Sequence, residues 1–561
     1  MSNTPWPIEV TNHPPLRTCE GKAPEHEGMC QRTIDMVCGT SANRVRAIFT
    51  DPGLTPSREF LERFTAECFR QPQVYRNMIL DNVKMDSLEK LDGGSVFYMW
   101  MNKTCPVGCD FCFFKSPKHS KKTDAVEITD EGINKLITFI NSANIDKFVI
   151  SGGGEPMMKK NKVLKLVKNV DVDKLVVVTS SFWSRNRGGT KKVVDGIRSA
   201  IGENPNDPEF VLRLSLDKDH VNRLCEKWEA HTDSLSTGPV GRFGYVHNLI
   251  DELSSGLDES NNPGFLIHTV MGDPTVEELL AELPVKSRED SGGEFTKRTQ
   301  VELEGGFKFE IEYSQLFASD VKVDVNDRNT AGHNIDKFQD FITERRGGNM
   351  SLSFHGDQPK GVYYLMLYDG TVLVWGATSP DIEASIYKDN YAATMEQNLA
   401  DPLTLGALEN GTFYREDIIS EVDDVAVKRA RGMGVRDFHS RSLLEQESTR
   451  LYASIRIIQD YIEAGRISQD DIDEWPPVLR VLISIPKDRL KKIYKESATD
   501  ILDQFLDDPN VGIDSLTSLY ELTQLGHYPL EKQELFDRVM SSNIDDDIKH
   551  QFADRFISMA M

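Results

Sequence analysis

Short apolar runs alternate with helical patterns over residues 94–316, and this alternation constrains the fold more than any other feature of the sequence. The runs are mostly apolar, which is typical of strands buried on both faces in a parallel sheet. Strands are expected within 94–105, 146–158, 173–184, 208–221, 264–273 and 307–316. Helices are expected at 129–143, 188–203, 244–257 and 275–284. Six β/α units of this kind predict an α/β fold of the parallel-barrel type.

Three of the eight cysteines, Cys105, Cys109 and Cys112, fall within eight positions on the predicted loop after the first strand. In a chain of 561 residues with 8 cysteines, this spacing arises by chance about two times in a thousand. A structural zinc site takes four ligands, and the nearest additional one, His119, lies in a run of positive charges. A [4Fe-4S] cluster fits better, because three thiolates leave its fourth iron open to a non-protein ligand.

The spacing C-x3-C-x2-C, with the aromatic Phe111 directly before the last cysteine, resembles the signature of the radical S-adenosylmethionine superfamily. The resemblance implies a partial (β/α)6 barrel of TIM type, with Cys105, Cys109 and Cys112 holding one [4Fe-4S] cluster and Phe111 in the cofactor site. In that family the open iron chelates the amino and carboxylate groups of S-adenosylmethionine. An electron from the cluster then cleaves the sulfonium to methionine and a 5′-deoxyadenosyl radical. The implied partner is an external electron donor such as flavodoxin or ferredoxin.

A run of three glycines, Glu155 and a proline follows the second predicted strand, about 40 residues after the cysteines. Glycines at the carboxyl end of a parallel strand let a ligand approach the backbone, and a carboxylate beside them can receive an ammonium group. The run resembles the "GGEP" element that holds the methionyl amino group in the radical S-adenosylmethionine family. By this resemblance, Gly153, Gly154 and Glu155 bind the cofactor. A plain turn at the end of a strand is the alternative.

Three further polar residues stand near the carboxyl ends of the third and fourth predicted strands, where parallel barrels place ligand groups. These are Ser180, Ser215 and Asp217, and "LSLDK" resembles the family's S-x-D element, which touches the ribose or the methionyl carboxylate. They are expected to face the cofactor. Ser180 as a strand-end cap and Asp217 as a helix cap are the alternatives.

The other cysteines favour a single cluster. Cys19, Cys30, Cys38 and Cys68 are widely spaced upstream and are expected to be reduced structural thiols, and no cysteine follows Cys225. Many family members carry auxiliary clusters in a cysteine-rich extension, which this chain lacks. Residues 361–380, with 398–406 after them, resemble the hairpin and following segment of such extensions without the thiols, and "YDGT" is a suitable hairpin turn. A plain hairpin that covers one end of the barrel is the alternative.

The expected organisation has four parts. An irregular and helical flank (1–93) precedes the barrel (94–320), and a cysteine-free hairpin extension (321–410) leads to a helical region (411–561).

The net charge of −24 disfavours nucleic acid and anionic membranes as partners. No secretory signal or apolar run of transmembrane length is apparent, and a cytoplasmic location is expected. The basic stretch 427–441 is expected to be a solvated helix, with binding of a substrate phosphate or carboxylate as the alternative.

These observations predict a radical enzyme that abstracts hydrogen from a small polar metabolite, derived from a sugar, nucleoside or amino acid, in a biosynthetic pathway. The acidic balance and the lack of an obvious peptide-recognition module favour this class of substrate. Modification of a peptide or protein, with the helical region as docking element, is one alternative. A non-catalytic scaffold that binds a cluster or zinc is another.

Overall fold

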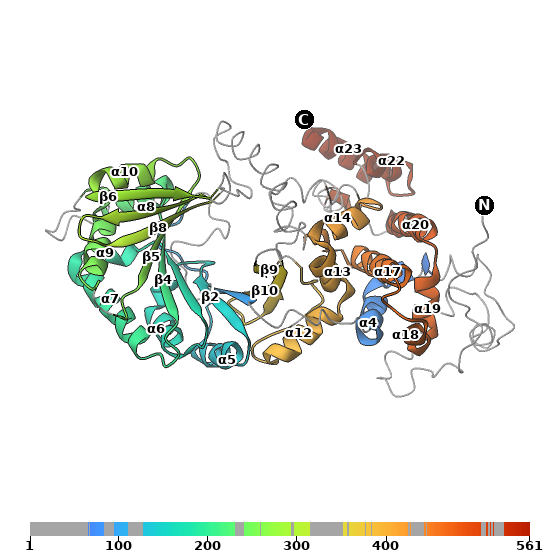
Figure 1. Cartoon of the computed structure of the whole chain (residues 1–561). Helices are drawn as coiled ribbons and strands as arrows, with labels where there is room; N and C mark the ends of the chain where they lie inside the picture. Colours follow the sequence, from blue (N-terminus) through green and yellow to red (C-terminus); the bar gives the residue numbers. More distant parts are fainter. Residues whose placement is uncertain are drawn as a thin grey trace.

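The computed structural model describes residues 65–83, 95–109, 127–229, 241–292, 297–314, 352–423, 442–506 and 532–560, with a few short gaps, and also residues 427, 512, 513, 516, 517 and 520. A large sheet flanked by helices lies beside a body made of helices (Figure 1). The sheet carries the cysteine loop.

Eleven strands of the described chain form this sheet, in the order β11-β10-β1-β2-β3-β4-β5-β8-β7-β6, with β9 paired to β10. Its central part is parallel, because each of these strands is separated from the next by at least one helix. The central strands are β1 (Ser95–Trp100), β2 (Ile145–Ser151), β3 (Lys174–Thr179), β4 (Glu209–Ser215), β5 (Gly264–Val270) and β8 (Lys308–Ser314). The predicted α/β fold with a partial TIM-type barrel is confirmed.

Amphipathic helices cover one face of the parallel strands (Figure 1). The first of them begins where predicted, since Thr129 accepts a hydrogen bond from the backbone of Gly132 and caps it. Its Phe139 packs on Phe97 of β1. The helices of the barrel are α5 (Asp130–Asn141), α6 (Lys160–Asn169), α7 (Arg187–Gly202), α8 (Lys218–Glu229), α9 (Gly244–Ser254) and α10 (Thr275–Glu282). Two 3₁₀ turns, η1 (Pro156–Lys159) and η2 (Phe182–Ser184), precede α6 and α7.

The opposite face of the strands, here called the interior face, has its own small apolar cluster. It consists of Val96, Val149, Val176 and Val211, one residue from each of β1 to β4. Because side chains alternate along a strand, residues an even number of positions from these valines also lie on the interior face. This rule assigns the polar residues discussed below to that face.

Two strands between α10 and β8 were not predicted. β6 (Val285–Ser291) and β7 (Arg298–Leu303) form an antiparallel hairpin that continues onto β8. β6 is an edge strand, and six of its seven residues are exposed. Charged side chains are one way in which proteins protect an edge strand, so β6 lacks the apolar pattern by which strands are recognised.

The predicted hairpin forms, but it extends the sheet. β10 (Gln358–Met366) and β11 (Val372–Val374) are antiparallel, and Gly370 in the turn between them has a φ of 86°. β10 also pairs in parallel with β1, so that Tyr363 lies opposite Val96, and β9 (Leu352–His355) pairs with the start of β10. The hairpin therefore extends the sheet beside β1, and the alternative, a plain hairpin over one end of the barrel, does not describe it.

The helical body combines the amino-terminal flank with the carboxyl-terminal region. α4 (Pro72–Asn82) packs against the long buried helix α17 (Glu447–Glu463). Tyr391 of α12 packs on Tyr364 of β10 and so joins this body to the sheet. The other members are α12 (Tyr391–Ala400), α13 (Pro402–Asn410), α14 (Thr412–Ser420), η4 (Ser442–Leu444), α18 (Gln469–Glu474), α19 (Pro477–Ser484) and α20 (Lys487–Leu506).

The last helices, α22 (Lys532–Ser541) and α23 (Asp546–Ala560), have a separate small core that includes Tyr520 and Phe552. The basic stretch 427–441 lies almost entirely outside the described residues. No helix in the described part of the chain is both long enough and apolar enough to cross a membrane.

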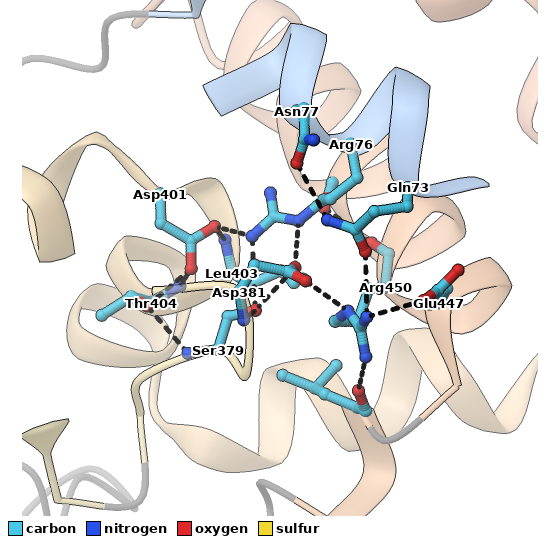
Figure 2. Close-up of polar contacts among 12 residues, drawn as sticks. Gln73, Arg76, Asn77, Ser379, Asp381, Asp401, Leu403, Thr404, Glu447 and Arg450 are labelled. Atoms are coloured by element: carbon cyan, nitrogen blue, oxygen red, sulfur yellow. Dashed lines mark hydrogen bonds and ion pairs between the residues drawn. The ribbon is translucent and has the colours of Figure 1, made fainter. Parts of the chain in front are cut away.

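A buried ionic network holds α4 in the helical body (Figure 2). Arg76, whose side chain is fully buried, bonds to Asp381 at 2.9 Å and also to Asp401. Asp381 bonds in addition to Arg450 of α17 at 3.0 Å. Asp401 caps α13 through the backbone nitrogens of residues 403 and 404. This buried network therefore connects α4 and α17 with the loop that holds Asp381 and with the start of α13.

Candidate functional site

Two of the three motif cysteines are described, and both lie on the loop that leaves β1. Cys105 and Cys109 are free thiols, partly exposed, and both pack against the apolar core. Gly108, just before Cys109, has a φ of 70°, which allows the tight turn of the loop. Cys112 and Phe111 lie outside the described residues.

The loop offers a soft donor set in an environment that suits an iron–sulfur cluster. Burial, and then the charge of Glu155, raise the pKa of Cys105 to about 11, so this thiol needs a cation beside it to ionise. Thiolates are the usual ligands of such clusters. Within the described ranges, no group of three or more His, Cys, Asp or Glu side chains is placed to bind a metal ion, and the third motif thiol lies beyond those ranges. The two described thiols fit the cluster.

The glycine-rich loop after β2 is bonded to the cysteine loop. The Glu155 nitrogen donates to the Thr104 carbonyl at 2.9 Å, and the Asn102 amide donates to the Glu155 carbonyl at 3.0 Å. Asn102 also accepts from the backbone of Thr104 at 2.8 Å. A Cβ on Gly154 would lie 2.2 Å from the Thr104 carbonyl oxygen, so only glycine allows this close approach. The two motifs, about 40 residues apart in sequence, thus form one structural unit.

The Glu155 carboxylate is 3% exposed and accepts four hydrogen bonds. Thr179 Oγ1 (2.7 Å) and the Met157 nitrogen (3.1 Å) donate to one oxygen, and the nitrogen and Oγ of Ser180 (2.7 Å each) donate to the other. Burial raises the pKa of Glu155, and these donors act against the increase. The chain's own donors thus fill the four main acceptor positions of the carboxylate. Ser180 contacts Glu155 directly.

The residues of the S-x-D element lie at the end of β4. Ser215 is on the interior face, opposite His268 of β5. Asp217 caps the start of α8, since its Oδ1 accepts from the nitrogens of Asp219 and His220 at 3.0 Å each. Its Oδ2 lies 2.6 Å from Nδ1 of His220. Burial favours the neutral ring, but the charge of Asp217 holds the pKa of His220 well above its ordinary value.

Residues that the sequence did not single out also line the interior face. Arg213, two residues before Ser215, lies 3.7 Å from Glu312 of β8. His268 lies beside them, and burial together with Arg213 holds its pKa well below its ordinary value. Across the face, Tyr98 of β1 packs edge-on against Trp375, with ring centroids 4.8 Å apart.

One protein-family model matches the part of the chain that holds both motifs. Residues 91–192 match the model of the 4Fe-4S single cluster domain, and this segment holds both motifs. This segment of the chain is therefore similar to a 4Fe-4S single cluster domain. The match supports a [4Fe-4S] cluster as a cofactor bound by this segment.

The search of solved structures found matches at low identity and low TM-score. One is anSMEcpe with bound AdoMet, at 14% identity and a TM-score of 0.33, with 69% of this chain and 98% of that chain covered. Another is SuiB of Streptococcus suis bound to precursor peptide SuiA, at 12% identity and a TM-score of 0.32, with 64% and 73% covered. No curated protein matches the chain significantly.

Replacing Glu155 by Gln is expected to weaken S-adenosylmethionine binding by about 1.5–3 kcal/mol, the Coulomb attraction between opposite charges about 6–11 Å apart at an effective dielectric constant of about 20. The variant removes the buried negative charge beside the glycines, and the cluster is expected to remain. Isothermal titration of cluster-loaded protein measures the change. Ser180→Ala is the matched control, since it removes one donor to the carboxylate and keeps the charge. An equal loss of affinity in both variants would assign the effect to the shape of the loop.

Proposed function

We propose that Cys105, Cys109 and Cys112 hold a single [4Fe-4S] cluster and that the enzyme abstracts hydrogen from a small polar metabolite bound at the interior face. When bound, the cluster and S-adenosylmethionine supply a 5′-deoxyadenosyl radical. An external one-electron donor such as flavodoxin or ferredoxin reduces the enzyme in the cytoplasm.

The hydrogen bonds between the cysteine loop and the Gly-Gly-Gly-Glu loop carry this proposal. They fix Gly153 and Gly154 next to the thiols, where the methionyl amino group must lie if it is also bound to the open iron. The Glu155 charge is buried directly behind these glycines and attracts the ammonium group. The chain therefore binds and orients the cofactor mainly through backbone atoms and one fixed charge.

The polar part of the interior face supports a small polar substrate. Arg213 Nε is buried and has no hydrogen-bond partner within the described ranges, and the structure shows no side-chain hydrogen bond from His268 to any described residue. A buried guanidinium Nε and a neutral imidazole, neither of which has a hydrogen bond to a described residue, suit a substrate with carboxylate, phosphate or hydroxyl groups. The aromatic pair Tyr98 and Trp375 supplies an apolar surface on the same face.

A peptide is the second candidate substrate, and the edge strand β6 favours it. Its outer side pairs with no other strand in the described part of the chain, and six of its seven residues are exposed. An extended peptide can add to such an edge through main-chain hydrogen bonds.

Incubation with deuterated candidates distinguishes these functions. Small polar metabolites that carry an acidic group are expected to transfer deuterium to 5′-deoxyadenosine, detected by mass spectrometry. Arg213→Met is expected to raise KM for such a substrate about tenfold, since about 1.4 kcal/mol of binding is lost with one charged hydrogen bond. Arg187→Met, at an exposed arginine on α7, is the matched control and should leave KM unchanged. Deuterium transfer from labelled peptides alone, with KM unaltered in Arg213→Met, would reject the small-substrate proposal.

A further inference from the structure

The last turn of α8 contacts the cysteine loop. Lys227 in this turn donates a hydrogen bond from Nζ to the Pro106 carbonyl, at 3.0 Å. Pro106 directly follows Cys105 and lies three residues before Cys109. The ammonium group therefore lies against the backbone that carries these motif thiols, although Lys227 and Pro106 are 121 positions apart in the sequence.

The turn that carries Lys227 is held in place through the next residue, Trp228. The Trp228 ring packs against the ring of the buried Tyr245 of α9, with ring centroids 5.4 Å apart. Arg185, which follows η2, donates to the Trp228 carbonyl at 3.4 Å, and its guanidinium lies over the Trp228 ring. These contacts fix the position from which the Lys227 side chain reaches the cysteine loop.

No ion pair within the described ranges neutralises the charge of Lys227. The acid next to it on α8, Glu226, pairs with Arg223 at 3.3 Å. The Lys227 side chain is partly buried, and such charges are screened less by water and salt than exposed charges are. A compact ammonium charge in this position therefore acts on any charge that the neighbouring thiols carry.

We propose that Lys227 raises the reduction potential of the cluster held by the cysteine loop, as a positioning residue whose charge is fixed by its bond to Pro106. The inference rests on the proposed function, in which Cys105 and Cys109 are cluster ligands. The external donor adds one electron, and hence one negative charge, to the cluster. A fixed positive charge nearby stabilises the reduced state, and net charge is one of the factors that set the potentials of such clusters.

Potentiometric titration of the reconstituted enzyme without S-adenosylmethionine tests this. Lys227→Met keeps the length of the side chain and removes the charge. At a fixed applied potential, the ratio of reduced to oxidised cluster is expected to fall about tenfold, which is about 59 mV for a one-electron couple. Lys227→Arg keeps the charge, so its ratio is expected to stay within about twofold of the wild type. Lys227→Gln keeps an N–H donor without the charge and is expected to behave like Lys227→Met.

Lys192→Met is the matched control, because Lys192 is an exposed lysine on α7, and its potential is expected to equal that of the wild type. A wild-type potential in iron-loaded Lys227→Met or Lys227→Gln would overturn the inference. If Lys227→Met does not retain its cluster, equal potentials in Lys227→Arg and Lys227→Gln would overturn it, since these two differ in charge. Wild type that takes up no [4Fe-4S] cluster would overturn the proposed function, and this inference with it.

Discussion

Cys109→Ala is expected to lose the cluster and all formation of 5′-deoxyadenosine under dithionite. Wild type reconstituted without oxygen should hold about four irons, as one cubane requires. Two remaining thiolates leave two irons without a protein ligand, so the cluster degrades. Iron and sulfide analysis, electron paramagnetic resonance with and without S-adenosylmethionine, and chromatography of the product measure the loss.

Cys225→Ala is the control for Cys109→Ala. Cys225 lies on α8, and its thiol contacts the Arg242 carbonyl at 3.7 Å. This variant should keep about four irons and full product formation. Circular dichroism checks whether both variants remain folded. Continued 5′-deoxyadenosine formation by folded Cys109→Ala would rule out the cluster as the source of the radical, and about eight irons in wild type would rule out a single cluster.

The parallel strands were predictable because burial on both faces leaves a continuous apolar run in the sequence. Leu175, Val176 and Val177 of β3 are all buried, and a run of this kind is recognised without knowledge of its neighbours. β6 had no such signal, because its residues face water on an edge. The pairing of β10 with β1 depends on contacts across more than 260 residues, which a local pattern cannot contain.

The residues of the candidate site also divide into those that a local sequence pattern can predict and those that it cannot. Glycines and cysteines at fixed spacing indicate a cofactor, and this is why the motif positions were predictable. Asn102 acts by bonding to a loop about 50 residues further on. Asn102 had one usable signal, a polar residue between an apolar strand and the first cysteine. For the contact of His220 with Asp217, the signal was the position of the histidine three residues after a helix-capping aspartate, where the cap and a side chain of the first turn lie close together.

The second large effect is expected far from the cysteines, at Arg76. Arg76→Met leaves Asp401 buried without an ion-pair partner among the described residues, since the ion pair of Arg450 is with Asp381 (Figure 2). Removing one partner of a buried ion pair costs about 3–5 kcal/mol. Hydrogen-exchange mass spectrometry should show loss of protection in α4 and α17, while the strands β2 to β4 keep theirs, because the network lies within the helical body.

A second variant separates the cost of the unpaired charge from the cost of lost packing. Asp401→Asn removes the charge, and the asparagine can still cap α13. The double variant Arg76→Met with Asp401→Asn therefore has no unpaired buried charge at position 401. It is expected to regain much of the protection from hydrogen exchange that Arg76→Met loses. Arg187→Met, at an arginine whose side chain is 83% exposed, should change stability by less than about 0.5 kcal/mol. If the double variant is as unstable as Arg76→Met alone, packing of the arginine side chain, and not its charge, holds α4 against α17.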